Sequence, residues 1–203
     1  MFSGIVEAVG RIQSVQPLPK ALQIKIEKPS DFNDLKIGDS VAVDGVCLTI
    51  EEFSNDSMTF TLADETLKVT GWTEEKLTNG QFNLERSLRM GDRIHGHLVA
   101  GHVDAVGEIV SRTEEGASLW YWIAFPESLK AMLWKKGSVS LKGVSLTIND
   151  IKENQLSLCL IPETLRRTNL ASLKVGDKVN LEVDSLARAM VNYMNVEGKK
   201  LWN

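Results

Sequence analysis

The chain has 203 residues, of which 43% are hydrophobic and 25% are charged, and its net charge is −4. That composition is typical of a globular protein of one or two domains with substantial cores. Because no basic run is longer than two lysines, a nucleic acid or an anionic membrane surface is disfavoured as a partner. Small molecules and other proteins stay open as partners.

The cysteines and the first residues indicate the compartment. Cys47 and Cys159 occupy non-equivalent places in the two halves of the chain, so we expect no structural disulfide and a reducing setting. The opening residues, MFSGIVEAVGRI, have no basic region before the apolar ones and indicate a strand rather than a signal peptide. No apolar run approaches the roughly 20 residues of a membrane-spanning helix. We therefore predict a cytoplasmic protein.

In chain order, the first half alternates short runs of β-branched and apolar residues with turn signals. Strands are predicted over residues 4–14, 21–28, 40–53, 57–63 and 81–86, and short helices over 29–35, 66–77, 126–134 and 164–173. This rhythm, without long stretches of helical periodicity, is typical of a small antiparallel barrel or sandwich. Two β-barrels in tandem are the simplest architecture, which makes the predicted fold class all-β.

The two halves are copies of one unit. Residues 40–50, SVAVDGVCLTI, recur at 138–148 as SVSLKGVSLTI, with seven of eleven residues identical. The same register aligns residues 65–67 with 163–165, and 83–85 aligns with 180–182. Because the period is domain-sized, each copy should close its own core. We predict barrels over residues 1–96 and 97–186, followed by a helix and tail over 187–203.

The last segment has helical periodicity. Apolar residues follow one helical face, and Asp184 or Ser185 is available as an N-cap. The residues of this face are Leu186, Ala189, Met190, Tyr193 and Met194. An appended helix with an apolar face must be covered, so it either joins copies from other subunits or packs on its own domain. We favour oligomerisation.

The copies differ at polar positions, and such asymmetry is what catalysis on two like ligands requires. Cys47 aligns with Ser145, and His102 aligns with an isoleucine. Asp44 aligns with Lys142. Two pockets of this kind would present different groups to two molecules of one ligand, making one a donor and the other an acceptor. Neutral drift is the alternative, since cysteine and serine are nearly isosteric.

The cysteine and histidines each allow a plainer interpretation. A lone cysteine in a strand such as that of Cys47 is often a small buried hydrophobe. The three histidines, His95, His97 and His102, suggest a metal site, but no cysteine or carboxylate cluster lies near them in a zinc-type pattern. A base or hydrogen-bond donor toward a bound heterocycle suits an imidazole better, because its pKa of about 6.5 favours proton transfer near neutrality.

Together, the motifs resemble a known family. MFSGIVEAVG, GVCLTI, LADETL, GHLVAGHVD, GVSLTI and LIPETLRRTNL occur in order, and the chain resembles riboflavin synthases, which contain two lumazine-binding repeats. The resemblance implies two six-stranded Greek-key barrels related by internal duplication and a C-terminal helix that forms a homotrimer. It implies dismutation of two 6,7-dimethyl-8-ribityllumazine molecules to riboflavin and 5-amino-6-(D-ribitylamino)uracil by transfer of a four-carbon unit, with no cofactor and no metal. An association with lumazine synthase is left open.

The resemblance also implies site residues. The first-barrel site falls on Gly4, Ile5, Val6, Cys47, Leu48, Thr49, Thr61, Leu62, Ala63, Asp64, Glu65 and Thr66. The second-barrel site falls on Gly101, His102, Val103, Lys136, Ser145, Leu146, Thr147, Cys159, Leu160, Ile161, Pro162, Glu163 and Thr164. Catalytic positions match Ser40, Cys47, His102 and Asp184, with Ser145 as a further candidate. The active site would lie between the first barrel of one subunit and the second barrel of a neighbour.

Physically, His102 is the candidate base for the acidic 7-methyl group of one lumazine. Cys47, Ser40 or Ser145 would attack carbon 7 of the other or activate a water for that attack. Two positions depart from the family pattern: His95 replaces a usual glycine, and Lys142 replaces a frequent small acidic residue. Lys142 would alter either the contacts between the barrels or the electrostatics of the second site.

Two other functions compete with the enzyme. A non-catalytic lumazine- or flavin-binding antenna protein would share the fold, but such relatives typically lose the cysteine and the central histidine that this chain has as Cys47 and His102. An oligonucleotide-binding barrel would show a basic groove with interleaved aromatic residues, whereas this chain is acidic and its five tryptophans are scattered.

Overall fold

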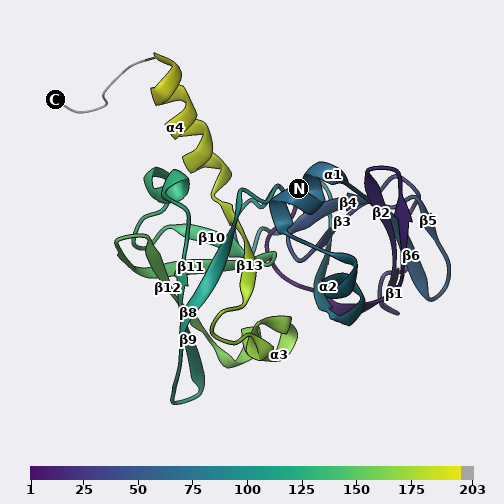
Figure 1. Cartoon of the computed structure of the whole chain (residues 1–203), viewed down its shortest axis with the longest axis horizontal. Coiled ribbons are helices and arrows are strands. Elements are labelled where there is room, and N and C mark those ends of the chain that lie inside the picture. The colour runs from purple at the N-terminus through teal and green to yellow at the C-terminus, as the bar shows by residue number, and fades with distance from the viewer. Residues whose placement is uncertain (198–203) are drawn as a thin grey trace.

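A computed structural model describes residues 1–197, and residues 198–203 of the predicted tail lie outside the described part. Two β units lie side by side, and a helix extends from the second unit (Figure 1). The structure confirms the mostly β fold class and the terminal helix.

The first unit is built from seven strands and two short helices. The sheet order is β4-β3-β7-β1-β2-β6-β5, with antiparallel pairing throughout. In chain order the elements are β1 (Ala8–Leu18), β2 (Ala21–Glu27), β3 (Ser40–Val43), β4 (Val46–Thr49), β5 (Glu52–Phe53), β6 (Ser57–Ala63), α1 (Asp64–Thr70), α2 (Glu74–Asn79) and β7 (Gln81–Arg86).

The second unit repeats this plan and closes it. Six strands form a barrel in the order β10-β11-β12-β9-β8-β13. Its elements are β8 (Ala105–Glu115), β9 (Ser118–Ala124), the 3₁₀ helix η1 (Glu127–Met132), β10 (Ser138–Leu141), β11 (Val144–Lys152), β12 (Gln155–Leu160), α3 (Pro162–Arg167), the 3₁₀ helix η2 (Asn169–Ser172) and β13 (Lys178–Val183). Helix α4 (Ser185–Glu197) follows.

One break in a strand explains why only the second unit closes its hydrogen-bonded ring. Strand β11 runs without interruption and pairs with β10 and then with β12. Its equivalent in the first unit is divided into β4 and β5, and Ile50 and Glu51 lie between them. The amide of Ile50 donates to Asp39 and that of Glu51 donates to Thr59, so the chain bends from one neighbour to the other. The strands of the first unit therefore follow the same path as those of the closed barrel. The ring is open between β4 and β5, the two consecutive strands at the edges of the sheet.

The predicted helices are partly wrong. Residues 29–35 form turns rather than a helix. The helix predicted over 66–77 is divided into α1 and α2, because Gly71 ends α1 in the left-handed conformation with φ +62°. The helix predicted over 164–173 is similarly divided into α3 and η2, and the side chain of Thr168 accepts from the amide of Leu170 at the start of η2.

Each unit has its own hydrophobic core, and each unit sends a short segment to the other: residues 2–7 are the first crossing segment and residues 96–104 are the second. Val6 precedes β1 of the first unit but packs in the core of the second. Val103 precedes β8 of the second unit but packs against the core of the first. Where the two segments cross, Phe2 and Val99 form an isolated antiparallel bridge, with Phe2 N donating to Val99 O at 2.8 Å. The strand predicted over 4–14 is therefore wrong at its start, because residues 4–7 belong to this crossing.

The interface between the units is polar and repeats the symmetry of the sequence. Asn83 of β7 donates its side-chain amide to the carbonyl of Lys142 at 2.9 Å. Its repeat partner Asn180 of β13 donates to the carbonyl of Asp44 at 3.1 Å. Each asparagine thus binds the turn of the other unit, which fixes the two barrels relative to one another.

Candidate functional site

A cavity of about 270 Å³ lies where the second crossing segment meets the first unit. Strand β4, helix α1 and residues 101–103 surround it. Its lining residues are Val46, Cys47, Glu65, Thr66, Val69, Thr70, Gly101, His102 and Val103. The cavity therefore combines the thiol, an imidazole, a carboxylate and hydroxyl groups against an apolar wall, as a binding site for a polar heterocycle requires.

Backbone contact between β4 and the crossing segment brings Cys47 and His102 to one cavity. The amide of Cys47 donates to the carbonyl of Gly101 at 2.8 Å. Gly101 has φ +81°, and a Cβ at this position would lie 2.5 Å from Cys47 Cβ. Glycine is thus required by both the left-handed backbone and the close approach. Since His102 follows directly, this contact determines where the imidazole lies.

A buried carboxylate holds the crossing segment in place. Glu182 of β13 accepts from the amides of Ala100 at 2.7 Å and Gly101 at 3.0 Å. Burial raises the pKa of Glu182 to about 7, although these two hydrogen bonds lower it. Arg188 of α4 binds Asp104 at 2.7 Å and lies 3.9 Å from Glu182, so the terminal helix also supports this segment.

The first crossing segment builds the equivalent place in the second unit. The amide of Ser145 donates to the carbonyl of Gly4 at 2.8 Å, and a Cβ on Gly4 would lie 2.5 Å from Ser145 Cβ. Glu85 accepts from the amides of Ser3 and Gly4 at 2.7 and 3.1 Å, as Glu182 does for the other segment. Burial raises the pKa of Glu85, against the lowering effect of its bonds to Ser3.

This geometry corrects the predicted grouping of residues. Gly4, Ile5 and Val6 were expected beside Cys47, and Gly101, His102 and Val103 beside Ser145. The structure places the first three against the second unit and the latter three against the first. The physical reason is the exchange of segments, which a linear repeat alignment does not reveal.

The remaining predicted binding residues divide between the site walls and the cores. Thr61 and Ala63 end β6, and Asp64, Glu65 and Thr66 form the first turn of α1. Cys159 and the core residue Leu160 end β12, Ile161 is the N-cap of α3, and Pro162, Glu163 and Thr164 form its first turn. Leu48 and Leu62 are buried in the first core, while Leu146 packs against the second. Thr49 is exposed at the end of β4, and the equivalent Thr147 is exposed within β11.

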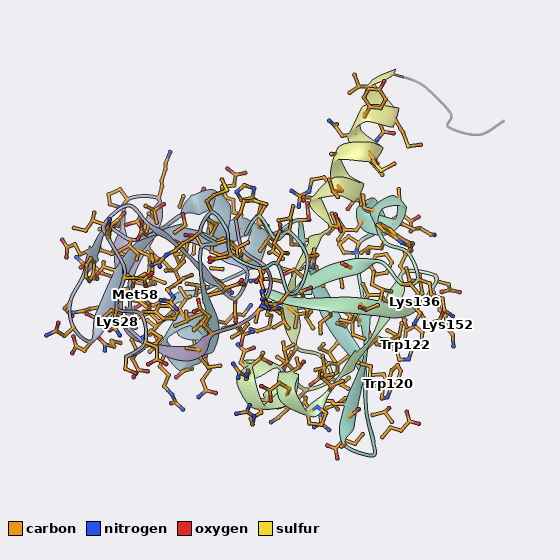
Figure 2. The ribbon with its side chains drawn as sticks, turned by 180° about the vertical axis from the view of Figure 1, so that it is seen from behind. Lys28, Met58, Trp120, Trp122, Lys136 and Lys152 are labelled. Carbon is orange, nitrogen blue, oxygen red and sulfur yellow. The ribbon has the colours of Figure 1, made fainter. Side chains whose placement is uncertain are left out.

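Three predicted residues lie apart from the Cys47 cavity. Ser40 pairs with Thr49 on β3, on the face that carries Cys47, but it does not line the cavity. Asp184 precedes α4 and accepts from the amide of Leu186 at 2.8 Å. Lys136 lies on the side of the second unit that faces away from the first (Figure 2). Lys136 therefore does not join the cavity within one chain.

Sequence reasoning missed two kinds of residue. Val46 of β4 and the residues Val69 and Thr70 of α1 line the cavity. Glu85 and Glu182 position the crossing segments. The aligned pair Asn-Leu-Glu at 83–85 and 180–182 was a signal for these glutamates, since a repeated acidic residue inside a buried strand needs a partner.

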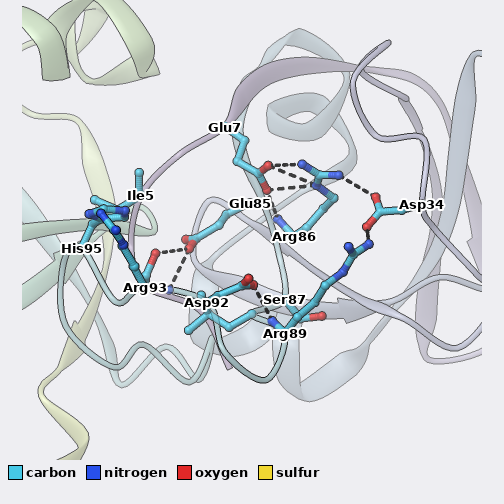
Figure 3. Close-up of a pocket in the computed structure, with 12 residues that line it drawn as sticks. Ile5, Glu7, Asp34, Glu85, Arg86, Ser87, Arg89, Asp92, Arg93 and His95 are labelled. Atoms are coloured by element: carbon cyan, nitrogen blue, oxygen red, sulfur yellow. Dashed lines mark hydrogen bonds and ion pairs between the residues drawn. The ribbon is translucent and has the colours of Figure 1, made fainter.

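A second cavity, of about 430 Å³, lies beside the first crossing segment (Figure 3). Arg86 binds Glu7 and Asp34, and Arg89 binds Asp34 as well. Figure 3 shows these two arginines directed at carboxylates, with Arg93 and His95 beside Ile5. Because its own acidic residues already neutralise Arg86 and Arg89, this cavity is a weaker candidate for ligand binding than the cavity at Cys47.

No group of three or more histidine, cysteine or acidic residues among residues 1–197 could hold a metal ion. Within the same range, no helix is both long and apolar enough to cross a membrane.

Comparisons with known proteins agree with the duplicated architecture. The model of the lumazine binding domain matches residues 3–87 and again 100–184. The chain is 38% identical to the riboflavin synthase of Photobacterium leiognathi, covering 97% of this chain and 90% of that protein. It is 40% identical to the riboflavin synthase of Brucella abortus, covering 93% and 95%.

Solved structures give the same relationship. LumP in complex with 6,7-dimethyl-8-(1'-D-ribityl) lumazine matches with a TM-score of 0.80 and 26% identity, covering 90% of this chain and 99% of that one. LumP in complex with riboflavin matches with a TM-score of 0.81 and 27% identity over the same shares. Since both repeats match the domain model and nearly the whole chain aligns with riboflavin synthases, the chain belongs to the riboflavin synthase family.

Proposed function

We propose that this protein catalyses the dismutation of two 6,7-dimethyl-8-ribityllumazine molecules. A four-carbon unit passes from one to the other, and the products are riboflavin and 5-amino-6-(D-ribitylamino)uracil. Family membership supports the reaction. The single structural observation that carries it is the presence of Cys47 and His102 in one cavity.

In this reaction the first-unit cavity supplies a base and a nucleophile. The 7-methyl group of the substrate is acidic because its carbanion is delocalised into the ring, so the His102 imidazole removes or relays that proton. The Cys47 thiol, or the equivalent Ser145 hydroxyl of the second unit, adds at carbon 7 of the other lumazine or activates a water that does so. Glu65 and Thr66 at the start of α1 bind the polar edge of the ring or its ribityl chain.

Much of the acceleration comes from holding two flat ligands in register. Holding two reactants in a reactive orientation lowers the activation barrier by up to about 7–11 kcal/mol. The two barrels, assigned to residues 1–96 and 97–186, each bind one lumazine. The two lumazines react only when they are adjacent, so the site of the first barrel must face the site of the second barrel of a neighbouring subunit.

We assign assembly to a homotrimer formed through α4. Leu186, Met190 and Val196 are 67%, 60% and 76% exposed on this helix, which extends away from its own barrel (Figure 1). An apolar helical face of this kind is typical of an interface. Lys136 lies on the side away from the first unit, so it contributes to the binding site that is shared with a neighbouring subunit. Two free cysteines fit a reducing cytoplasm. Association with lumazine synthase would bring the substrate directly to the trimer.

The test is product formation from purified protein and 6,7-dimethyl-8-ribityllumazine. We expect riboflavin and the diaminouracil product in equal amounts, with no added cofactor and no loss of rate in the presence of a chelator. Tight lumazine binding without turnover would instead favour the antenna function suggested by the similarity to LumP. Salt-sensitive binding of single-stranded nucleic acid would favour the oligonucleotide-binding alternative.

A further inference from the structure

His97 forms a close hydrogen bond with Ser145, a contact that the function described above does not use. His97 Nδ1 lies 2.7 Å from Ser145 Oγ. The other ring nitrogen, Nε2, is buried and has no hydrogen-bond partner among residues 1–197. A buried ring nitrogen of this kind is costly, so its retention calls for a role beyond packing.

The backbone holds His97 at this place. Its amide donates to the carbonyl of Ser3 at 3.2 Å, beside the Phe2–Val99 bridge. At Gly96, a Cβ would lie 2.1 Å from Ser3 O and 2.6 Å from Ser145 Cβ. The segment is therefore pressed against both the first crossing segment and Ser145, which gives the imidazole little freedom to turn away.

Ser145 stands in the second unit where Cys47 stands in the first. The backbone amide of each of these residues donates a hydrogen bond to a carbonyl of a crossing segment, at 2.8 Å in both units. In the first unit the nearby imidazole belongs to His102. In the second unit it belongs to His97. Cys47 and Ser145 therefore each lie near an imidazole, and both imidazoles come from the second crossing segment.

The charge on His97 suits a proton acceptor. Burial lowers the pKa of the imidazole, and the nearby carboxylate of Asp184 raises it in part. The ring is therefore neutral at pH 7, and it can take a proton from a hydroxyl. The Asp184 carboxylate is held by the amide of Leu186 at the start of α4, so it is a stable anionic neighbour for the imidazolium that would form.

We propose that His97 is the positioning residue that orients and deprotonates the Ser145 hydroxyl in the second-unit site, with Asp184 as its anionic neighbour. This deepens the proposed function and rests on it. As the Oγ–C7 bond to a bound lumazine forms, the hydroxyl proton passes to His97 Nδ1. The displaced π electrons move into the conjugated pyrimidine ring. When the oxygen leaves, the same proton returns to it.

The test compares four variants by steady-state kinetics on the lumazine substrate: His97→Ala, His97→Asn, Ser145→Ala and the double variant His97→Ala/Ser145→Ala. We expect His97→Ala to lower kcat about 100-fold. Because His97 acts through Ser145, the double variant should be no slower than Ser145→Ala alone, within about twofold. Multiplied effects of the two single changes would overturn the proposal.

The asparagine variant separates proton transfer from structure. Its amide can occupy the position of Nδ1 and hydrogen-bond Ser145, but it cannot accept a proton. We expect KM and thermal stability near those of the wild type with kcat still low. Full activity in His97→Asn would mean that His97 has a structural role only. Glu115→Ala, at an exposed position of β8 that lines neither cavity, is the control and should leave all three values unchanged.

Added imidazole gives a second readout. It should restore part of the rate in His97→Ala, where a space is left, and none in Ser145→Ala. Rescue of both variants, or of neither, would contradict the assignment. A wild-type protein that forms no riboflavin would instead overturn the proposed function, and the role of His97 with it, so the two failures are distinguishable.

Discussion

Asp44 and Lys142 hold equivalent positions in the two repeats and form an ion pair across the interface between the barrels. The side chain of Asp44 is fully buried and that of Lys142 is 15% exposed. The other Asp44 oxygen, Oδ1, accepts from the amide of Asn83 at 2.8 Å and from the side chain of Asn169 at 2.9 Å. Lys142, the departure from the family pattern, thus acts on the contacts between the barrels.

Lys142→Met should lower the free energy of unfolding by about 3 kcal/mol, because it leaves a buried carboxylate without its counter-charge. Chemical denaturation measures this change. The double variant Asp44→Asn/Lys142→Met should recover most of the loss, since it removes both charges. Lys135→Met is the matched control: its pair with Asp150 is exposed, and the loss should be below about 1 kcal/mol. Equal losses in both single variants would contradict the role of burial.

Cys47→Ser and His102→Gln should each reduce turnover while largely preserving ligand affinity. Both side chains line the same cavity, whose polar wall also includes Glu65 and Thr66 and stays intact in these variants. Loss of a positioned acid, base or nucleophile typically lowers kcat on the order of 100-fold or more. Steady-state rates and riboflavin binding by fluorescence separate the two effects. Unchanged rates in both variants would remove these residues from the mechanism.

Gly101→Ala should lower the free energy of unfolding by about 2–3 kcal/mol and disrupt lumazine binding in the first unit. The added Cβ would lie 2.5 Å from Cys47 Cβ, and the backbone is left-handed there. Gly116→Ala is a control with a similar backbone, φ +61°, and open space around it. It should cost about 1 kcal/mol and leave binding unchanged. The prediction is wrong if the two variants behave alike.

Glu182 should make the protein less stable as pH rises. Its pKa is raised by burial to about 7, against an ordinary value of 4.5. Between those values the folded protein binds more protons than the unfolded chain, so this contribution to stability is full below pH 4.5 and is lost by about pH 7. Urea unfolding at pH 5 and pH 7.5 should show a smaller difference for Glu182→Gln than for the wild type. An identical difference in both proteins would contradict the assignment.

Met190→Glu should convert the proposed trimer into monomers. The side chain is 60% exposed in the single chain, so the change should not affect folding of the barrels. A charge in the covered interface would be costly to desolvate. Analytical ultracentrifugation gives the mass of the assembly. Asn195→Glu, also exposed on α4, is the matched control and should leave the mass unchanged. A wild-type monomer would exclude α4 as the source of assembly.

The terminal helix and most of the strands could be predicted from the sequence because they depend on local patterns. Residues 21–27, 57–63 and 81–86 form strands close to the predicted ranges, since β-branched and apolar runs are bounded there by turn residues. The helix over 66–77 was predicted as one piece, and Gly71 divides it. The sequence contained that glycine, but propensity alone does not distinguish a tolerated glycine from a helix end.

The sequence by itself determined that the molecule contains one unit twice and that the copies differ at Cys47 and Ser145, because identity and difference are read directly from aligned residues. Only the tertiary structure decided which residues meet. Val6 enters the second core and Val103 packs on the first, so His102 faces Cys47 and His97 faces Ser145. Such pairings depend on contacts between residues some 50 to 140 positions apart, which local patterns do not encode.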